Sequence, residues 1–477
     1  MARDTAAEIA AELCVIGAGS GGLSAAAGAA RMGVDVVLIE AAEMGGDCLN
    51  AGCVPSKALI AAAKRAAEPR RAEAFGLTSA RAQADGARVR AHVRDVIAQI
   101  APLDSQERFE GLGVRVIRAR ARFVAPDAVA ADGLRVRARR FVVATGSRPA
   151  IPPIPGLAET PRLTNETVFD LAEIPRRLIV IGGGPIGTEL SQAFARLGAE
   201  VALIDSGRPL SREDPEAAAV VTEALRRDGV SLRLDARAER VEGGEGRVSV
   251  RLEGGETLEG SHLLVAVGRR LTLDALDLDA AGVRVRDGRI ALDDGLRSVS
   301  NKRVYAVGDA AGGLQFTHLA AHHAGVALRR ALFRLPAKAA APLPRVTYAA
   351  PELAQVGETE AEARAALGSR LRVLRAEYAE SDRARAERAI EGFVKVMTDP
   401  RGRVRGATIV GAQAGELIQL WTLAMSAGLR VGEVASMIAP YPTLGELNKR
   451  AAGRFYEGRL FGNPWVARAA KALVRLG

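Results

Sequence analysis

A glycine-rich turn between a buried strand and a helix occurs twice in this chain, and this repeat constrains the fold more than any other feature. In the first copy, Leu13–Ile16 leads into Gly17-Ala18-Gly19-Ser20-Gly21-Gly22, and a helical stretch follows to Met32. The next apolar run, Val34–Ile39, ends in Glu40. Strand, glycine turn, helix, strand and acid in this order are typical of a dinucleotide-binding βαβ unit.

The glycines and the acid of such a unit have separate roles. Gly17 makes the tight turn, Gly19 lets a pyrophosphate approach the backbone, and Gly22 lets helix and strand pack closely. The carboxylate of Glu40 is expected to accept hydrogen bonds from the hydroxyls of an adenosine ribose. The first unit therefore predicts a nucleotide site near the start of the chain.

The second copy begins with the apolar strand Arg177–Ile181 and ends at Asp205. Its turn glycines are Gly182, Gly184 and Gly187. The interval from first glycine to acid is 23 residues in both copies, from 17 to 40 and from 182 to 205. Because chance rarely gives two complete patterns at equal spacing, we expect one chain to bind two dinucleotides.

Two cysteines five positions apart, Cys48 and Cys53, follow the first unit, and the only other cysteine is Cys14. A disulfide needs Cα atoms within about 4.4–6.8 Å, which is closer than positions i and i+5 of a regular helix. If the two cysteines pair, Cys48 must lie in a distorted first turn, with backbone freedom from neighbouring glycines such as Gly46. A thiolate at a helix start is stabilised by the helix dipole. The alternative is a pair of buried, inert thiols.

A nicotinamide cannot pass hydride directly to a disulfide, because one step is hydride transfer and the other is thiolate exchange. A flavin accepts hydride on one face and exchanges electrons with sulfur on the other. The pattern therefore predicts an enzyme with FAD and NAD(P)H as cofactors.

Three further motifs bring the chain close to a known family. They are Ala144-Thr145-Gly146-Ser147-Arg148-Pro149, Ala266-Val267-Gly268-Arg269-Arg270, and Val304-Tyr305-Ala306-Val307-Gly308-Asp309-Ala310. With them, nearly the whole chain resembles the class I pyridine nucleotide-disulfide oxidoreductases, which include dihydrolipoamide dehydrogenase, glutathione reductase and mercuric reductase. The resemblance implies that Asp309 holds the ribityl chain of the flavin. It also implies cofactor contacts at Gly46, Lys57, Ala144, Thr145, Gly146 and Gly268.

The resemblance also implies catalytic roles. Cys48 would be the interchange thiol that meets the substrate, and Cys53 the thiol on the flavin side. Lys57 would lie beside flavin N5 and pair with Glu189, because a cation there favours the reduced anionic ring and a carboxylate keeps that cation in place. The alternative for Lys57 and Glu189 is two unrelated surface charges.

The choice of coenzyme depends on the end of the second βαβ unit. Asp205 would accept a hydrogen bond from the adenosine 2′-hydroxyl and repel a 2′-phosphate, and Gly187 also favours NAD. Arg208, three residues later, is the alternative signal, since it could face a phosphate. NAD is favoured.

The C-terminal region departs from the best-known relatives. Where disulfide reductases have His-Pro-Thr-x-x-Glu, this chain has Tyr441-Pro442-Thr443-Leu444-Gly445-Glu446. A phenol with a pKa near 10 donates a hydrogen bond but is a poor base at pH 7, so Tyr441 predicts slow dihydrolipoamide turnover. Mercuric reductase also has tyrosine there, but it carries a C-terminal cysteine pair, and no cysteine follows Cys53 here. Alternatively, Tyr441 only shapes a loop.

Three histidines, His318, His322 and His323, lie in a segment expected to begin a helix capped by Thr317. A polar helix face is the favoured interpretation, and a position for His318 at the flavin edge is the second. His318 and His322 share a face, but no third ligand is near them in the sequence. We therefore predict no metal site.

The predicted fold class is α/β, with two Rossmann-like dinucleotide-binding domains and a C-terminal α+β dimerisation domain. The FAD domain is expected at 1–150 and 271–345, the NAD(P) domain at 151–270 and the dimerisation domain at 346–477. A homodimer is expected, because the C-terminal motif of the family reaches into the active site of the partner subunit.

Composition limits the partners and the compartment. The net charge is +10, but the arginines are scattered and aromatic residues make up only 4%, which argues against nucleic-acid binding. No apolar run reaches the roughly 18 residues needed to span a membrane, and the N-terminus lacks a signal pattern. With so few cysteines, we expect a cytoplasmic protein.

The last residues form an amphipathic pattern. After Pro464, one helical stripe holds Trp465, Val466, Ala469, Leu473 and Leu476, and another holds Arg468, Lys471 and Arg475. Packing of this tail against the partner subunit is favoured over contact with a membrane surface.

The sequence thus predicts an oxidoreductase that passes electrons between NAD(P)H and a disulfide or dithiol, either a small molecule or a lipoyl group. The alternatives are a soft-metal reductase resembling mercuric reductase, and an electron-transfer component that docks on a protein partner.

Overall fold

The first glycine turn lies at the end of the central strand of a seven-stranded sheet. The structure is a computed structural model, and it describes residues 7–78, 83–457, 460 and 463–476. The order of the sheet is β3-β2-β1-β6-β5-β4, and β18 pairs with the second half of β6. The strands are β1 (Glu8–Ile16), β2 (Val36–Glu40), β3 (Arg115–Arg118), β4 (Arg122–Ala125), β5 (Ala128–Ala131), β6 (Leu134–Val143) and β18 (Val304–Ala306).

Both faces of this sheet are covered. Helices α1 (Ser20–Ala30) and α9 (Thr317–Phe333) pack on one face against Leu13, Val15 and Leu38. Cys14 and Ile16 point into a second apolar cluster on the other face, with Phe123 and Phe141. Because the strand end before the turn is buried on both faces, it is continuously apolar.

The second glycine turn follows strand β8, which lies in a four-stranded parallel sheet of order β10-β9-β8-β14. A three-stranded antiparallel sheet, β11-β12-β13, packs on it through Val241, Val248 and Val250. The bounds are β8 (Arg177–Ile181), α7 (Pro185–Arg196), β9 (Glu200–Ile204), α8 (Pro215–Arg227), β10 (Ser231–Arg233), β11 (Ala238–Gly244), β12 (Arg247–Leu252), β13 (Thr257–Gly260) and β14 (His262–Val265). The chain passes from the first unit to the second after β7 (Ser147–Pro149) and returns to the first unit through β15 (Arg269–Leu271). These two strands pair antiparallel.

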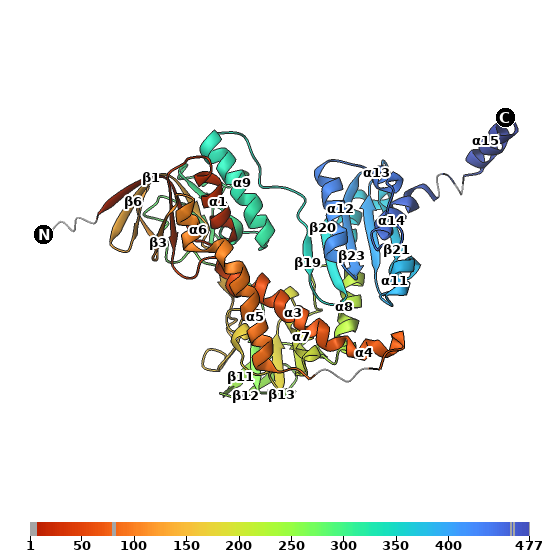
Figure 1. Cartoon of the computed structure of the whole chain (residues 1–477), viewed down its shortest axis with the longest axis horizontal. Helices are drawn as coiled ribbons and strands as arrows, with labels where there is room; N and C mark the ends of the chain where they lie inside the picture. Colours follow the sequence, from red (N-terminus) through yellow and green to blue (C-terminus); the bar gives the residue numbers. More distant parts are fainter. Residues whose placement is uncertain (1–6, 79–82, 458–459, 461–462, 477) are drawn as a thin grey trace.

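The third unit is a five-stranded antiparallel sheet of order β19-β20-β23-β22-β21. It comprises β19 (Arg345–Thr347), β20 (Glu352–Gly357), α10 (Glu360–Leu367), β21 (Arg372–Glu377), α11 (Asp382–Ala386), β22 (Phe393–Thr398), β23 (Val404–Gly411), α12 (Ala414–Ser426), α13 (Val431–Ser436) and α14 (Glu446–Tyr456). Trp421 of α12 and Leu447 of α14 pack against the sheet. A last helix, α15 (Pro464–Arg475), lies apart from this unit (Figure 1).

Helix α3 (Cys53–Ala67) joins the first two units. Its residues Ala58, Leu59 and Ala63 share one apolar cluster with Leu190 and Phe194 of α7, and α5 (Gly86–Ile100) adds Val93 to the same cluster. This packing places α3 beside α7, although the two helices are more than a hundred residues apart in sequence (Figure 1).

The predicted α/β class, with two dinucleotide-binding units and a C-terminal α+β unit, is confirmed. The exact domain boundaries stay a prediction. Strand β1 begins at Glu8 rather than Leu13, because its exposed first half pairs with β6 between Arg135 and Ala138 and alternates in burial. The expected cap at Thr317 is wrong: α9 begins with Thr317, and the residue at the cap position, Phe316, makes no side-chain cap hydrogen bond.

Candidate active site

One cavity of about 2420 Å³ runs from the first glycine turn to the second. It is lined by residues of all three units, including Tyr348 next to β19. Seventeen predicted positions line it: Gly17, Gly19, Glu40, Gly46, Cys48, Cys53, Lys57, Ala144, Thr145, Gly146, Gly182, Gly184, Glu189, Asp205, Gly268, Asp309 and His318. Tyr441 and Glu446 are not among its lining residues.

The two glycine turns have the same geometry. Gly17 has φ of +103° and Gly182 has φ of +108°, so both lie where side chains are strained. A Cβ on Gly22 would lie 1.8 Å from the Gly17 oxygen, and one on Gly187 would lie 1.9 Å from the Gly182 oxygen. Neither Gly22 nor Gly187 lines the cavity. The third glycine of each turn therefore serves packing.

Glu40 and Asp205 are equivalent acids. Glu40 accepts backbone N–H bonds from Ala18 at 2.5 Å and Ala42 at 2.6 Å, and Asp205 accepts them from Gly183 at 2.6 Å and Gly207 at 2.8 Å. Each carboxylate oxygen has two lone pairs, so both acids can still accept from a ribose.

Arg208 does not face the cavity. Its guanidinium donates to the backbone oxygens of Ser211 and Glu213, both at 3.1 Å. The guanidinium is therefore held by the backbone of its own loop, and Arg208 is not among the residues that line the cavity.

The two cysteines lie on separate helices. Cys48 is in the short α2 (Gly46–Asn50), which Gly45 begins with a left-handed φ of +86°, and Cys53 is the first residue of α3. The distortion needed to bring the cysteines together is therefore a complete break between two helices. Both cysteines are free thiols here, and Cys53 is open to the cavity rather than buried.

The surroundings divide the two thiols into a thiolate and a proton donor. The hydrogen bond from Cys48 lowers the pKa of Cys53 to about 6, with further lowering by the hydroxyl of Thr317 and the charge of Lys57, against burial and the charge of Asp47. The same hydrogen bond, with burial, raises the pKa of Cys48. The Thr317 oxygen lies 3.3 Å from the Cys53 sulfur. Thr317 thus contacts the sulfur instead of capping α9.

Replacing Thr317 by valine should raise the pKa of Cys53 toward that of an ordinary thiol, because the hydroxyl lowers it. In the reduced protein, we expect alkylation of Cys53 near pH 6 to slow several-fold, since only the thiolate reacts. The pH dependence of iodoacetamide labelling measures this shift, and Thr317→Ser, which keeps a hydroxyl, is the matched control. An unchanged labelling profile in Thr317→Val would contradict the assigned contact.

Lys57 and Glu189 form an ion pair of 2.8 Å, so they are not unrelated surface charges. Glu189 is 5% exposed, and its second oxygen accepts the backbone N–H of Tyr348 at 2.8 Å. The ammonium of Lys57 stands 4.4 Å from the centroid of the Tyr348 ring. A buried carboxylate and an aromatic face hold this cation at the cavity wall. Sequence reasoning missed Tyr348, because a lone aromatic residue beside a short strand carries no pattern.

A polar chain links the cysteine loop to Asp309. The Ser147 hydroxyl donates to Asp309 at 2.5 Å, and Arg269 donates to Ser147 at 2.7 Å. Arg269 also pairs with Asp47, beside Cys48, at 3.3 Å, and Asp47 accepts from the amide of Asn165 at 3.0 Å. Burial raises the pKa of Asp309. Asp47, Asn165 and Arg269 were missed because their partners are far apart in sequence.

The histidines are bound to a neighbouring loop. His318 Nε2 lies 2.9 Å from the Pro344 oxygen, and His322 Nε2 lies 3.2 Å from the Ala339 oxygen. Burial, with the nearby charge of His322, lowers the pKa of His323 to about 4. Across the described ranges, no group of three or more histidine, cysteine or acidic side chains is arranged to hold a metal.

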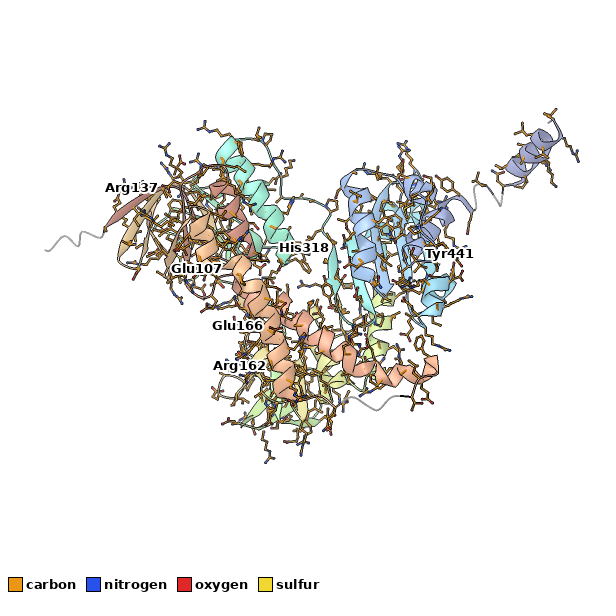
Figure 2. All side chains as sticks on the ribbon, viewed as in Figure 1. Glu107, Arg137, Arg162, Glu166, His318 and Tyr441 are labelled. Atoms are coloured by element: carbon orange, nitrogen blue, oxygen red, sulfur yellow. The ribbon has the colours of Figure 1, made fainter. Side chains whose placement is uncertain are left out.

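Tyr441 and Glu446 lie on the third unit, away from the cysteines of the same chain. Tyr441 is 70% exposed, and Figure 2 shows it on the side of that unit opposite His318. Its hydroxyl donates to Asp382 at 3.0 Å, which raises the pKa of Tyr441. Glu446 accepts a bond from the Thr443 N–H at 3.4 Å. A role at the cysteines therefore requires a second subunit. Asp382 is a partner that the sequence did not indicate.

The cavity fits an extended dinucleotide with a flavin. A Cβ on Gly19 would meet nothing closer than 3.9 Å, so the backbone of the turn is open to a phosphate. The buried Thr145 hydroxyl on the cavity wall has no hydrogen-bond partner among the described residues, and the Asp309 carboxylate also lies on that wall. Both groups suit the polar part of FAD.

Comparison with known proteins agrees with this geometry. Residues 11–324 match the sequence profile of the pyridine nucleotide-disulphide oxidoreductases, and residues 343–452 match the dimerisation domain of the same proteins.

Two curated relatives have different activities. Mercuric reductase from Bacillus cereus is 35% identical over 92% of this chain and 71% of its own length. Dihydrolipoyl dehydrogenase from Thermus scotoductus is 37% identical over 91% of this chain and 95% of its own length.

Two solved structures share the fold. The HOCl-induced flavoprotein disulfide reductase RclA from Escherichia coli has a TM-score of 0.83 at 28% identity, covering 92% of this chain and 99% of its own. LpdA from Mycobacterium tuberculosis has a TM-score of 0.85 at 29% identity, covering 93% and 99%. Members of this family are enzymes that use FAD and NAD(P)H. The chain therefore belongs to the pyridine nucleotide-disulphide oxidoreductase family.

Proposed function

We propose that this chain is a homodimeric NADH oxidoreductase that passes two electrons through Cys48 and Cys53 to a disulfide, either a small molecule or a lipoyl group. The observation that carries the proposal is the polarised thiol pair, with Cys53 as thiolate and Cys48 as proton donor, on the wall of a cavity that reaches both glycine turns. FAD, when bound, supplies the relay between hydride and sulfur. NADH and one proton are consumed as one disulfide becomes two thiols.

Each residue has a separate task in this proposal. Cys48 attacks the substrate disulfide and forms a mixed disulfide, and its proton goes to the first thiolate that leaves. The Cys53 thiolate then attacks the Cys48 sulfur, closes the Cys48–Cys53 bond and displaces the second thiolate, which takes up one proton from solvent. Lys57, held by Glu189 and the Tyr348 ring, keeps a positive charge beside the Cys53 thiolate. A cytoplasmic location fits this chemistry, because a reducing compartment keeps a working dithiol available.

A second candidate is the reduction of a soft metal ion as substrate, and Tyr441 favours it. Its hydroxyl donates to Asp382 and so does not act as a base on a thiol. Thiolates bind soft metals without such a base. Among relatives, mercuric reductases match along nearly the whole chain, and one RclA structure is a Cu(II) complex. No cysteine follows Cys53 to relay a metal from the tail.

The substrate class can be tested by NADH consumption with lipoamide, small disulfides, Hg(II) and quinones. Turnover of a disulfide that is lost in Cys48→Ser supports the first candidate, and turnover of Hg(II) alone supports the second. Reduction of quinones alone, unchanged in Cys48→Ser, would contradict both candidates, because the electrons would then bypass the thiols.

Asp205→Ala should reduce the preference of the enzyme for NADH over NADPH, measured as the ratio of the two kcat/KM values. The carboxylate accepts from a 2′-hydroxyl and repels a 2′-phosphate, and a hydrogen bond to a charged group is worth about tenfold or more in binding. We expect kcat/KM for NADH to fall by about that factor and the value for NADPH to rise. The ratio of the two values measures the effect. Higher efficiency with NADPH in the unmodified protein would contradict the assignment.

A further inference from the structure

Helix α15 lies beyond the part of the chain that matches the dimerisation domain, which ends at residue 452. It is a well-formed helix, because the Asn463 side chain caps it by accepting the Trp465 N–H at 3.0 Å. Every residue from Pro464 to Arg475 is exposed, and Trp465 and Leu473 are 75% and 67% exposed. Figure 1 shows α15 apart from the five-stranded sheet. The helix therefore has a large apolar surface with no partner in the part of the chain that the structure describes.

The two faces of α15 differ in chemistry. At 100° per residue, Trp465, Ala469, Leu473 and Leu476 fall on one side, and Arg468, Lys471 and Arg475 fall on the other. The Arg468 guanidinium stands 5.3 Å from the Trp465 ring centroid, at the boundary of the two faces. From position 458 to 477, the sequence has four basic residues and no acidic residue. This uniform positive charge favours binding to a negatively charged partner.

We propose that α15 docks on the surface of an anionic lipid bilayer. The apolar stripe would enter the boundary between headgroups and acyl chains, and the basic stripe would face the lipid phosphates. Trp465, at the edge of the stripe, has the amphipathic ring that favours this depth. Sequence alone favours packing on the partner subunit, but the uniform positive charge of the helix favours an anionic surface instead.

The helix lies on the bilayer and does not cross it. Its 12 residues span about 18 Å, which is well short of the roughly 30 Å hydrocarbon core. Within the described ranges, no helix is long and apolar enough to cross a membrane. A single helix of this kind binds a bilayer weakly. In the homodimer, which is part of the proposed function, two copies of α15 would bind the same bilayer, and avidity would make the binding tighter.

Vesicle co-sedimentation with the full-length, FAD-loaded protein tests the proposal. We expect binding to vesicles of phosphatidylcholine with phosphatidylglycerol and little binding to phosphatidylcholine alone. Binding should weaken strongly between about 0.1 M and about 1 M salt, where the screening length falls from about 10 Å to about 3 Å. Each basic residue near an anionic surface contributes about fivefold to binding. Combined Arg468→Glu, Lys471→Glu and Arg475→Glu should therefore lower binding by more than about a hundredfold.

The matched control reverses three exposed arginines elsewhere, Arg31, Arg139 and Arg372, giving the same change in net charge. This control should lower binding only a few-fold. The double variant Trp465→Ala with Leu473→Ala should also reduce binding to the vesicles, but the salt dependence of the remaining binding should be unchanged. In all variants, bleaching of the flavin absorbance by NADH reports correct folding. Loss of bleaching would indicate a failure of the redox function, and loss of vesicle binding with normal bleaching would indicate a failure of docking.

Three results would overturn the proposal. Equal loss in the matched control would mean that net charge alone drives binding. Loss of the dimer on deleting 464–477, with no vesicle binding by the intact protein, would assign α15 to the partner subunit. Binding to native membranes but not to lipid vesicles would assign it to a membrane protein.

Discussion

Cys48→Ser should lower disulfide turnover by on the order of 10³-fold or more, the loss expected when a nucleophile is removed, while NADH still bleaches the flavin absorbance. The serine hydroxyl can still donate to the Cys53 sulfur, so the thiolate should persist. A thiolate–flavin charge-transfer absorbance should therefore appear in this variant without any reductant. Because the Thr317 hydroxyl and the charge of Lys57 also lower the pKa of Cys53, the band should grow as pH rises and should be present near neutral pH.

Cys53→Ser should also lose turnover but lack the band, because no sulfur remains on the flavin side. Cys14→Ala is the matched control. Cys14 is fully buried in the sheet core and should affect neither signal. A band in Cys53→Ser and none in Cys48→Ser would reverse the two roles.

Tyr441→His should raise dihydrolipoamide turnover by about tenfold or more, since a general base contributes about 10²–10⁴-fold. The phenol donates a hydrogen bond to Asp382, and the carboxylates of Asp382 and Glu446 raise its pKa, so the phenol stays protonated and is a poor base. An imidazole has a pKa near 6.5, so at pH 7 it is mostly deprotonated and can accept a proton from a thiol. The rate of flavin bleaching by NADH should stay unchanged, because hydride transfer does not use this residue.

Tyr441→Phe separates base chemistry from a change of shape. It removes the hydroxyl and its bond to Asp382 without adding a base, so we expect no gain in dihydrolipoamide turnover. An equal gain in the phenylalanine variant, or high dihydrolipoamide turnover in the unmodified protein, would contradict the idea that Tyr441 limits the substrate class.

The features that sequence reasoning predicts well are those set by local rules. The tight packing of Gly22 against Gly17, and of Gly187 against Gly182, leaves room for no side chain, so the spacing of each turn is visible in the sequence. The pairing of Lys57 with Glu189 was accessible only through the family resemblance, because α3 and α7 meet through an apolar cluster that no local pattern encodes.

The features that sequence reasoning missed are long-range polar contacts. Asp47 meets Arg269, Tyr441 meets Asp382, and Glu189 meets the backbone of Tyr348. The first and third contacts depend on how separate units pack, and the second joins two segments of the third unit that are 59 positions apart. The error at Thr317 has a related cause: threonine is a common helix cap, but here its hydroxyl is turned to a sulfur 264 positions away.

The most direct test of the account is to count the cysteines that NADH exposes. The FAD-loaded protein is first oxidised, then given NADH without oxygen, and finally labelled with a thiol reagent and mapped by mass spectrometry. We predict that Cys48 and Cys53 are labelled only after NADH is added, and that the buried Cys14 is labelled in neither case. Bleaching of the flavin absorbance with no new label on Cys48 and Cys53 would show that electrons do not reach the thiols, and it would contradict the account.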